Sequence, residues 1–491
     1  MLAAPLLCAS GQQDPLREAQ RLRDNGQLVQ ALALLDQRLA QNPADVEAAR
    51  MRAQTLYWLK DFAQARSSYA AALQQHPRHE PLRVEYARML AETGDRPAAK
   101  AILDHLRGDP LSPDAAALLG TILYWDGDLT GARRLFLDAV DTDPTQREAA
   151  RQLREIQVMS SSWVRVAPVV WHDDQPLDKM GVEVEAGWFL TPLLSLSVRS
   201  EPDRSSAVTA QMFWTNEIEV SHYAPAARLE TRLAAGAFRH PAGPGDLDRT
   251  WRAALGFRAG SGVTLRGRLA REPYLHSVSS LETPLITRTA SGAVHWSRAD
   301  GWLGEAAVQR QTFPDANAVR TAYAWLLAPL ARRPDGQFQA GYAVAASDTD
   351  EDRFVLARPQ QPFLPDDPRF DFAGVYHPYY TPARNVTHSL IAALTAGSTG
   401  PVLRAGGSYG FHAREDATAF QALGTQIVPS IVRRAYTPWI LRCSLEFPAS
   451  ANVAFSVGGE SGRTAYYRWT TARVQVVYRF LPPDPGDARP R

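Results

Sequence analysis

The chain has 491 residues, of which 45% are hydrophobic and 21% are charged, and its formal net charge is +1. This composition excludes a disordered chain, and the length predicts two or three folded domains. The near-zero charge provides no bulk attraction to nucleic acid, so we expect no nucleic-acid partner. The two cysteines, Cys8 and Cys443, are too few for a disulfide framework or a cysteine-rich metal site.

Residues 1–13 run from apolar to small to polar side chains, with small residues at Ala9 and Ser10. This order is typical of the end of a secretory signal. A basic stretch before the apolar run is missing, so we interpret the segment as the remnant of a signal peptide or as a disordered N-terminus. Lipidation of Cys8 stays open, although the residue before it, Leu7, is larger than such sites usually have.

Residues 14–159 contain an internal repeat. Four prolines, Pro43, Pro77, Pro110 and Pro144, close similar blocks at spacings of 34, 33 and 34 residues. A short turn divides each block, an alanine allows close helix contact, and an aromatic residue or a leucine fills the groove between neighbours. The pattern resembles the tetratricopeptide repeat, which implies a solenoid of about four helical repeats with a concave surface for a protein or polymer.

Residues 160–480 show period-two alternation in place of helical periodicity. Val182 and Val184, for example, alternate with Glu183 and Glu185. No run of about 18 apolar residues occurs, so we expect no membrane-spanning helix. Strands with one apolar and one polar face favour an antiparallel transmembrane β-barrel of about 14–16 strands. A β-sandwich or a large soluble β-domain is the alternative.

Aromatic residues near the ends of these segments fit the girdles that barrels place at both membrane surfaces. They include Trp171, Trp188, Trp214 and Trp251. The polar face of each strand would then line the lumen. The alternation gives these candidate pore-lining residues: Glu183, Glu185, Glu230, Arg232, Arg266, Arg268, Arg473 and Arg479. Residues 481–491 follow the last predicted strand and are expected to form a periplasmic C-terminal tail.

Two segments depart from the alternating pattern. One is 271–277, and the other is 348–385, which is rich in proline and aromatic residues and carries Tyr376, Tyr379 and Tyr380. Loops of this length are usually functional or disordered. Aromatic rings with a polar handle suit sugar contacts, so the three tyrosines are candidate sugar-contact residues. A loop folded into the pore and an extracellular loop packed on itself are the other interpretations.

No sequence motif supports catalysis or cofactor binding. Residues 406–410 match the hydrolase elbow pattern, but they lie in an alternating strand with no helix after it. Asp348, Asp350 and Asp352 have the spacing of calcium ligands, but Arg353 stands where the loop requires glycine, so a surface loop is the better interpretation. We therefore expect no catalytic residue, no cofactor, no metal site and a protein that is not an enzyme.

A repeat solenoid followed by a barrel resembles the bacterial exopolysaccharide export porins of cellulose and poly-N-acetylglucosamine secretion. The resemblance implies an α + β multidomain protein in the bacterial outer membrane with its N-terminal domain in the periplasm. The implied partners are an exopolysaccharide chain, periplasmic or inner-membrane synthesis or secretion proteins at the repeats, and outer-membrane lipid. Those exporters carry more repeats than this chain. Translocation of surface lipoproteins or other proteins, and a solute porin with a docking domain, are the alternatives.

Overall fold

The chain forms two compact units, Met1–Ile156 and Gln157–Arg491. A computed structural model describes residues 14–105, 111–174, 177–207, 210–241, 247–260, 262–277, 280–281, 284–352, 379–397, 400–423, 426–465 and 467–481. The segment 1–13 and the tail beyond 481 lie outside the described residues, so the interpretations of Cys8 and of both ends stay predictions.

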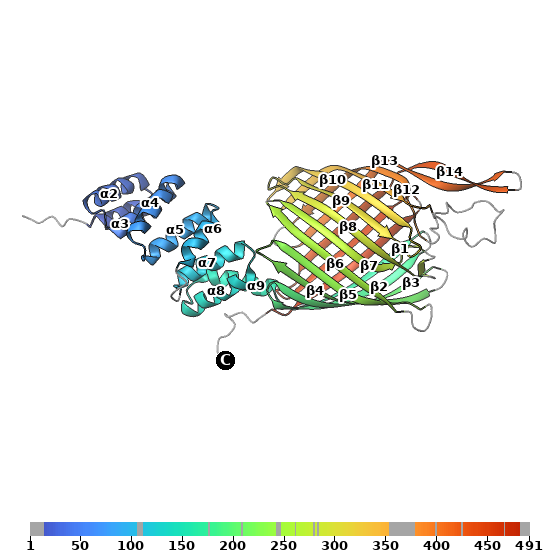
Figure 1. Ribbon diagram of the computed structural model, residues 1–491, viewed down its shortest axis with the longest axis horizontal. Helices are drawn as coiled ribbons and strands as arrows, with labels where there is room; N and C mark the ends of the chain where they lie inside the picture. Colours follow the sequence, from blue (N-terminus) through green and yellow to red (C-terminus); the bar gives the residue numbers. More distant parts are fainter. Residues whose placement is uncertain are drawn as a thin grey trace, which may run out of the picture. The chain divides into compact units, whose positions relative to one another are not determined.

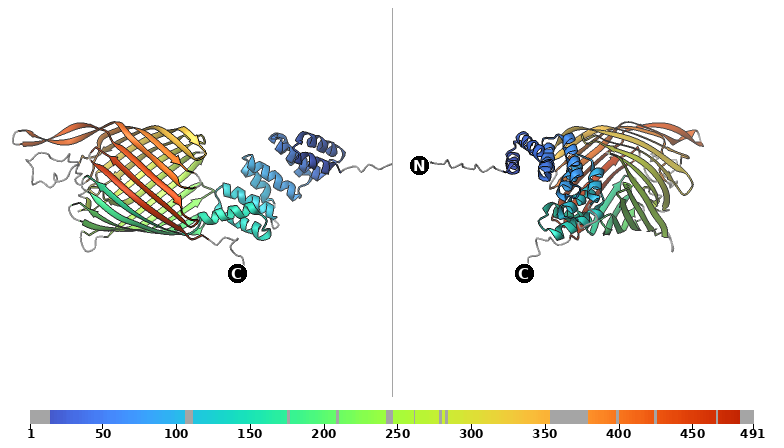
Figure 2. Two further views of the ribbon diagram at one scale, coloured as in Figure 1. Left: turned by 180° about the vertical axis from the view of Figure 1, so that it is seen from behind. Right: turned by 60° about the vertical axis from the view of Figure 1, so that its left-hand side comes forward.

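The described part of the first unit is a series of helix pairs (Figures 1 and 2). The helices are α1 (Pro15–Asp24), α2 (Leu28–Gln41), α3 (Val46–Trp58), α4 (Phe62–Gln75), α5 (Glu80–Glu92), α6 (Arg96–Asp104), α7 (Pro113–Trp125), α8 (Leu129–Thr142) and α9 (Arg147–Met159). Each helix contacts mainly its neighbours in the series, as in a solenoid. The predicted helical repeats are confirmed. Among the described residues, no helix is long and apolar enough to cross a membrane.

Side-chain caps and positive-φ turns set where these helices begin and end. Asp61, Asp95 and Asp128 each accept a hydrogen bond from a backbone N–H in the first turn of the following helix. Such caps satisfy backbone donors that have no partner within the helix. Gly94 and Gly127, which precede two of these caps, have φ values of 95° and 83°. Glycine adopts this conformation without steric cost, so the Gly-Asp pairs are the turns of the repeat.

Small residues and aromatic rings form the core of the repeats at the predicted positions. Ala65 and Ala132 are fully buried, and so are the rings of Tyr69 and Phe136. A Cβ atom added at Gly120 would lie 2.7 Å from the Phe136 ring. Gly120 therefore allows α7 and α8 to approach closely.

The second unit is a closed antiparallel β-barrel (Figures 1 and 2). Its strands are β1 (Trp163–Asp173), β2 (Asp178–Thr191), β3 (Leu194–Ser206), β4 (Ala210–Ala224), β5 (Leu229–Arg239), β6 (Leu247–Gly260), β7 (Val263–Tyr274), β8 (Leu285–Ser297), β9 (Leu303–Thr312), β10 (Ala318–Arg333), β11 (Gly336–Thr349), β12 (Ala383–Ala396), β13 (Val402–Leu423), β14 (Gln426–Tyr436), β15 (Trp439–Pro448), β16 (Val453–Arg463) and β17 (Arg468–Arg479). Because β1 pairs with both β2 and β17, the sheet closes. Sixteen strands form the barrel and β14 is additional, which confirms the predicted fold class.

The extra strand β14 forms a hairpin with the far part of β13. Near the rim, β13 pairs with β12 as far as Asp416 and with β15 as far as Tyr409, whereas its remaining part pairs with β14. Pro438 lies between β14 and β15, and its carbonyl accepts a hydrogen bond of 2.7 Å from the Gly410 N–H. The hairpin projects beyond the barrel wall (Figure 1).

The two rims of the barrel carry different connections. At the rim where β1 begins, which we call the short-turn end, β2 ends at Thr191 and β3 begins at Leu194. At the opposite rim, the loop end, residues 275–284 join β7 to β8 and residues 350–382 join β11 to β12. Short turns at one rim and longer loops at the other are typical of outer-membrane barrels.

Side chains alternate between an apolar outer face and a polar inner face. Exposed hydrophobic residues such as Ile218, Leu255 and Val308 mark the outer face, and their sequence neighbours point inward. Trp188, Trp214 and Trp251 are exposed on the outer face, as the predicted girdle requires. The prediction for Trp171 was wrong, because the strand register places this residue on the inner face. β1 is apolar on both sides here, so alternation alone does not assign the face.

Candidate functional site

The inner wall formed by β17, β1 and β2 carries an ion-pair cluster around Glu183. The Nη2 atom of Arg165 lies 2.5 Å from Glu183 Oε1 and also contacts Glu185. Arg473 on β17 reaches the other oxygen of Glu183 at 3.0 Å. Glu183 is 8% exposed, and both of its oxygens have an arginine partner. Closure of the sheet makes this contact, because 290 residues separate Arg473 from Glu183 in the sequence.

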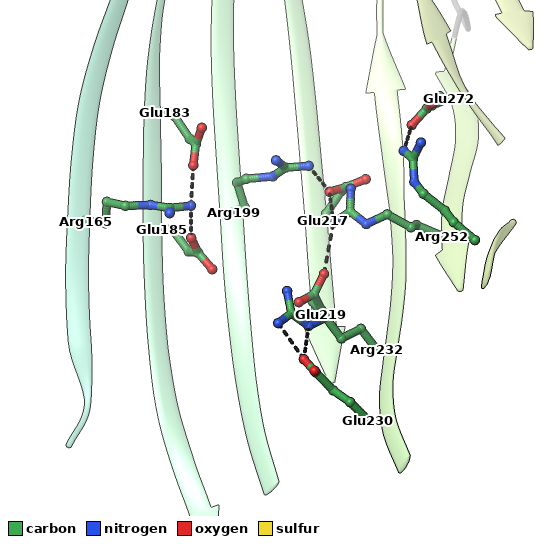
Figure 3. Close-up of polar contacts among 11 residues, drawn as sticks. Arg165, Glu183, Glu185, Arg199, Glu217, Glu219, Glu230, Arg232, Arg252 and Glu272 are labelled. Carbon is green, nitrogen blue, oxygen red and sulfur yellow. Dashed lines mark hydrogen bonds and ion pairs between the residues drawn. The ribbon is translucent and has the colours of Figure 1, made fainter. Parts of the chain in front are cut away.

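A second cluster continues along the wall from β3 to β6 (Figure 3). Arg199 on β3 contacts Glu217 on β4. The Nη2 atom of Arg252 on β6 lies 3.4 Å from Glu217 Oε2 and 2.9 Å from Glu219 Oε2. Glu217 thus contacts arginines from two other strands, and Glu219 contacts an arginine from one.

The remaining predicted pore-lining residues also lie on the inner face. Arg232 pairs with Glu230 at 2.5 Å (Figure 3), and Arg268 pairs with Glu272 at 2.5 Å. Arg266 lies 3.6 Å from Glu305 on β9. Arg479 stands opposite Trp163 in the register and has no ion-pair partner among the described residues. The placement agrees with a lumen lining, and a role in transport stays a prediction for all eight.

The inner wall from β8 to β12 is different, because hydroxyl and amide side chains dominate it. Thr289, Gln309 and Thr387 point inward here. The Oγ1 atom of Thr321 lies 3.0 Å from the Oγ atom of Ser347 on the neighbouring strand. The lumen thus has one wall of mutually paired charges and, from β8 to β12, a wall of mainly neutral hydrogen-bonding groups that includes the charged Glu305.

Aromatic residues also face the lumen near the loop end. Trp171 stacks on Trp469 with ring centroids 6.1 Å apart, and its Nε1 donates a hydrogen bond of 3.1 Å to Asp173. Phe213 on β4 and Phe238 on β5 stack with centroids 5.8 Å apart and are fully buried. These apolar rings would be exposed to water in the lumen if the loop joining β7 to β8 did not pack on them.

The described residues of the loop joining β7 to β8 pack against the inner face at the barrel mouth. Leu281 of this loop is 2% exposed and packs with Phe213 and Phe238. The Lys179 ammonium on β2 donates a hydrogen bond to the Leu275 carbonyl at the other end of the loop. Because β2 and β7 are separated by four strands in the wall, the loop is held from two directions across the lumen. Residues 271–274 of the segment 271–277 belong to β7, so the interpretation as a loop was wrong for them, and only 275–277 are part of this loop.

The described end of the segment 348–385 packs against the same mouth. Tyr379 is 1% exposed, its ring stacks on Phe313 at 3.5 Å, and its hydroxyl donates to Asp315 at 2.7 Å. The Tyr380 hydroxyl donates to Glu415 at 2.7 Å. With Phe313 on its face, Tyr379 offers no free ring to a sugar in this arrangement. Tyr376 lies outside the described residues, and sugar contact stays a prediction for all three tyrosines.

The three aspartates with calcium-like spacing point to different partners. Asp348 accepts a hydrogen bond from the Arg384 N–H, Asp350 pairs with Arg320, and Asp352 accepts from Thr381. Across the part of the chain that the structure describes, no group of three or more potential metal ligands converges.

Sequence reasoning missed several residues of the lumen. Glu217 and Glu219 alternate with Ile218 and lie on the same face as the predicted residues, so the signal was present in the sequence. Lys179 alternates with Met180 and Val182, so its inward direction was also readable, but its contact with Leu275, 96 residues away, was not. Contacts across the lumen require the closed barrel.

Comparisons with known proteins match the two units separately. The tetratricopeptide repeat family model matches residues 59–109. A structure described as a bacterial polysaccharide outer membrane secretin is similar over 66% of this chain and 99% of its own, with 9% identity and a TM-score of 0.48. MamA from Desulfovibrio magneticus RS-1 is 22% identical over 30% of this chain and 86% of its own, with a TM-score of 0.27. Pseudomonas aeruginosa pilF is 19% identical over 29% of this chain and 65% of its own, with a TM-score of 0.28.

No curated protein matches the sequence. The family match, the helix pairs and the strand order together define the architecture. The chain joins tetratricopeptide repeats to a closed, 16-strand antiparallel β-barrel.

Proposed function

We propose that this protein is an outer-membrane export porin for an exopolysaccharide and that it acts without catalysis. The inner wall carries the proposal. Most of its charges are paired with one another, as Arg165 and Arg473 are with Glu183, and its other side presents hydroxyl and amide groups. A hydrated polymer can exchange hydrogen bonds with such a wall without being held by a strong net charge, as conduction requires.

The outer face supports the proposed location. A closed barrel leaves no unpaired backbone edge in its wall, and lipid tolerates only such structures and helices. The exposed apolar residues of the outer face, Ile218 and Leu255 among them, suit contact with acyl chains. The chain enters the barrel at the short-turn end, because β1, which follows α9 in the sequence, begins there. Since outer-membrane barrels have their short turns in the periplasm, we place the repeats there.

The repeats supply a groove for the polymer or for a secretion partner. A cavity of ≈ 600 Å³ is lined by aromatic and charged side chains, including Tyr57, Trp58, Tyr69, Arg88 and Glu92. Aromatic faces suit sugar rings, and charged groups suit a protein partner. We propose that this groove receives the polymer or binds periplasmic or inner-membrane secretion proteins.

Deletion of the gene in a polymer-producing host tests the proposal. We expect polymer to accumulate in the periplasm and full-length protein to restore secretion. Normal secretion in the deletion strain would overturn the export function. Loss of surface lipoproteins with normal polymer would instead support a protein translocator, and loss of small-solute uptake alone would support a solute porin.

A direct assay separates transport from host physiology. Purified full-length protein in a planar bilayer should conduct ions, and a neutral oligosaccharide added on the short-turn side should block the current transiently. A doubly substituted variant, E183Q/E217Q, keeps the shape of the wall but removes the carboxylates from both clusters. We expect longer block times for anionic sugars in this variant, because unpaired arginines remain.

A further inference from the structure

Arginines accumulate on the outer face of the barrel near the loop end. Arg271 on β7 stands directly opposite Arg288 on β8, and Arg310 on β9 stands directly opposite Arg320 on β10. Arg271 and Arg310 each follow an exposed apolar residue of the outer face by two positions, so they point outward. Like charges directly opposite each other in neighbouring strands repel. Two such pairs within four adjacent strands require a compensating partner.

The protein compensates only part of this charge. Arg271 pairs with Asp248 at 3.0 Å, and Arg320 pairs with Asp350 at 2.5 Å. Arg288 and Arg310 are exposed and have no ion-pair partner among the described residues. In the register, Arg288 is opposite Thr312 and Arg310 is opposite Ala290. They are therefore diagonal neighbours, about 7–8 Å apart at the backbone. One anionic group can be reached by both of these long side chains.

An apolar groove lies on the same face, beside the arginines. It has a volume of ≈ 1000 Å³. Its lining comprises outward-facing apolar residues, such as Leu255, Leu269 and Val308. The charged residues Arg310, Arg320, Arg384 and Asp348 line its end near the loop-end rim. The apolar part of the groove suits acyl chains, and at its charged end three arginines stand against one aspartate.

The strand positions place the cations at headgroup level. Arg320 is close to the first residue of β10 and Arg271 is close to the last residue of β7, so both lie next to the loop-end rim. Trp251 stands directly opposite Arg271 and is exposed on the outer face. Tryptophan prefers the interface between hydrocarbon and water. The apolar groove then faces acyl chains and the arginines face headgroups.

We propose that this face binds a phosphorylated lipid, with its acyl chains in the groove and a phosphate between Arg288 and Arg310. The guanidinium fork matches the geometry of phosphate oxygens and forms short, charge-assisted hydrogen bonds with them. A zwitterionic headgroup would bring its own cation to a surface that already has a positive excess. The inference rests on the proposed placement of the barrel in a membrane, with the loop end in the outer leaflet, but not on the proposed cargo.

Lipid titration of the full-length protein in neutral detergent tests this site by native mass spectrometry. The probes are dioleoyl phosphatidic acid, dioleoyl phosphatidylcholine with the same acyl chains, and inorganic phosphate. We compare wild type with R288Q/R310Q. The matched control is R204Q/R239Q, which removes two arginines that also point outward near the loop end but lie outside the groove. A heat-dependent gel shift verifies that each barrel is folded.

We expect wild type and the control to bind phosphatidic acid at least tenfold more tightly than phosphatidylcholine, and R288Q/R310Q to lose that preference. Equal binding of the two lipids to wild type, or the same loss in the control, would overturn the site. Displacement of the lipid by an equal concentration of inorganic phosphate would also overturn it, because a free anion would then be the ligand. A variant that loses the lipid preference but still exports polymer shows that the lipid site is not needed for export. A variant that keeps the lipid preference but no longer exports polymer shows that the lipid site stands without the proposed function.

Discussion

Release of the loop 275–284 from the barrel mouth is a testable consequence of the way the loop is held. Leu281 is almost fully buried against Phe213 and Phe238. Replacing a buried leucine by alanine costs about 2–5 kcal/mol. The contact belongs to the docked loop and not to the strand ladder, so L281A should act on loop docking. At about 1.4 kcal/mol per factor of ten, the ratio of released to docked loop should rise about 30-fold or more.

Single-channel recording in a planar bilayer measures this change. We expect L281A to show a larger mean conductance, or a larger fraction of time in the high-conductance state, than wild type. The matched control is L255A, since Leu255 is exposed on the outer face and touches no part of the mouth. If a folded L281A barrel, verified by its heat-dependent gel shift, conducts like wild type and L255A, the loop does not obstruct the lumen.

Three further changes probe the lumen and the repeats. E183Q leaves two arginines without their shared carboxylate, so the reversal potential in a salt gradient should shift toward anion selectivity, and a shift toward cations would contradict the cluster's role. F136A removes a fully buried ring, so thermal unfolding followed by circular dichroism should show the repeats destabilised by about 3–5 kcal/mol while the barrel's gel shift persists. Burial raises the pKa of Glu85 above its ordinary 4.5, although Arg50 opposes the shift. Protonated Glu85 therefore stabilises the folded repeats below pH 4.5. This stabilisation is lost as the pH rises through the higher pKa that Glu85 has in the folded protein. As the pH rises through this range, the melting temperature of the repeats should fall more in wild type than in E85Q. If melting temperature depends on pH in the same way in both proteins, Glu85 does not have a raised pKa.

The repeats were predictable because each one is built from contacts within a short stretch of chain. The period, the Gly-Asp turns and the packing alanines are all local signals, and the structure places Ala65 and Ala132 in the core. The barrel wall was also predictable, because alternation assigns a face to each strand without knowledge of its partners. Glu183 and Glu185 lie on the polar face for this reason.

The partners of those side chains were not predictable. The contact of Arg473 with Glu183 depends on which strand closes the barrel, and that of Lys179 with Leu275 depends on a loop crossing the lumen. Alternation also fails where both faces are apolar, as at Trp171. The extra strand β14 could not be separated from β15 by periodicity, because only Pro438 and the pairing with β13 mark the break.

In the proposed membrane placement, the hairpin of β13 and β14 sets an upper limit to the extent of the hydrocarbon layer. Beyond Asp416, β13 no longer pairs with β12, and on its other side it pairs with β14 in place of β15. Among the described residues, β14 has a register with β13 alone. Backbone N–H and C=O groups on such edges need water, because acyl chains offer no hydrogen bonds. The hydrocarbon core of the bilayer must therefore end at or below the level of Asp416. The backbone hydrogen bonding alone thus limits where the hydrocarbon core ends at the loop end of the barrel, independently of any hydropathy scale.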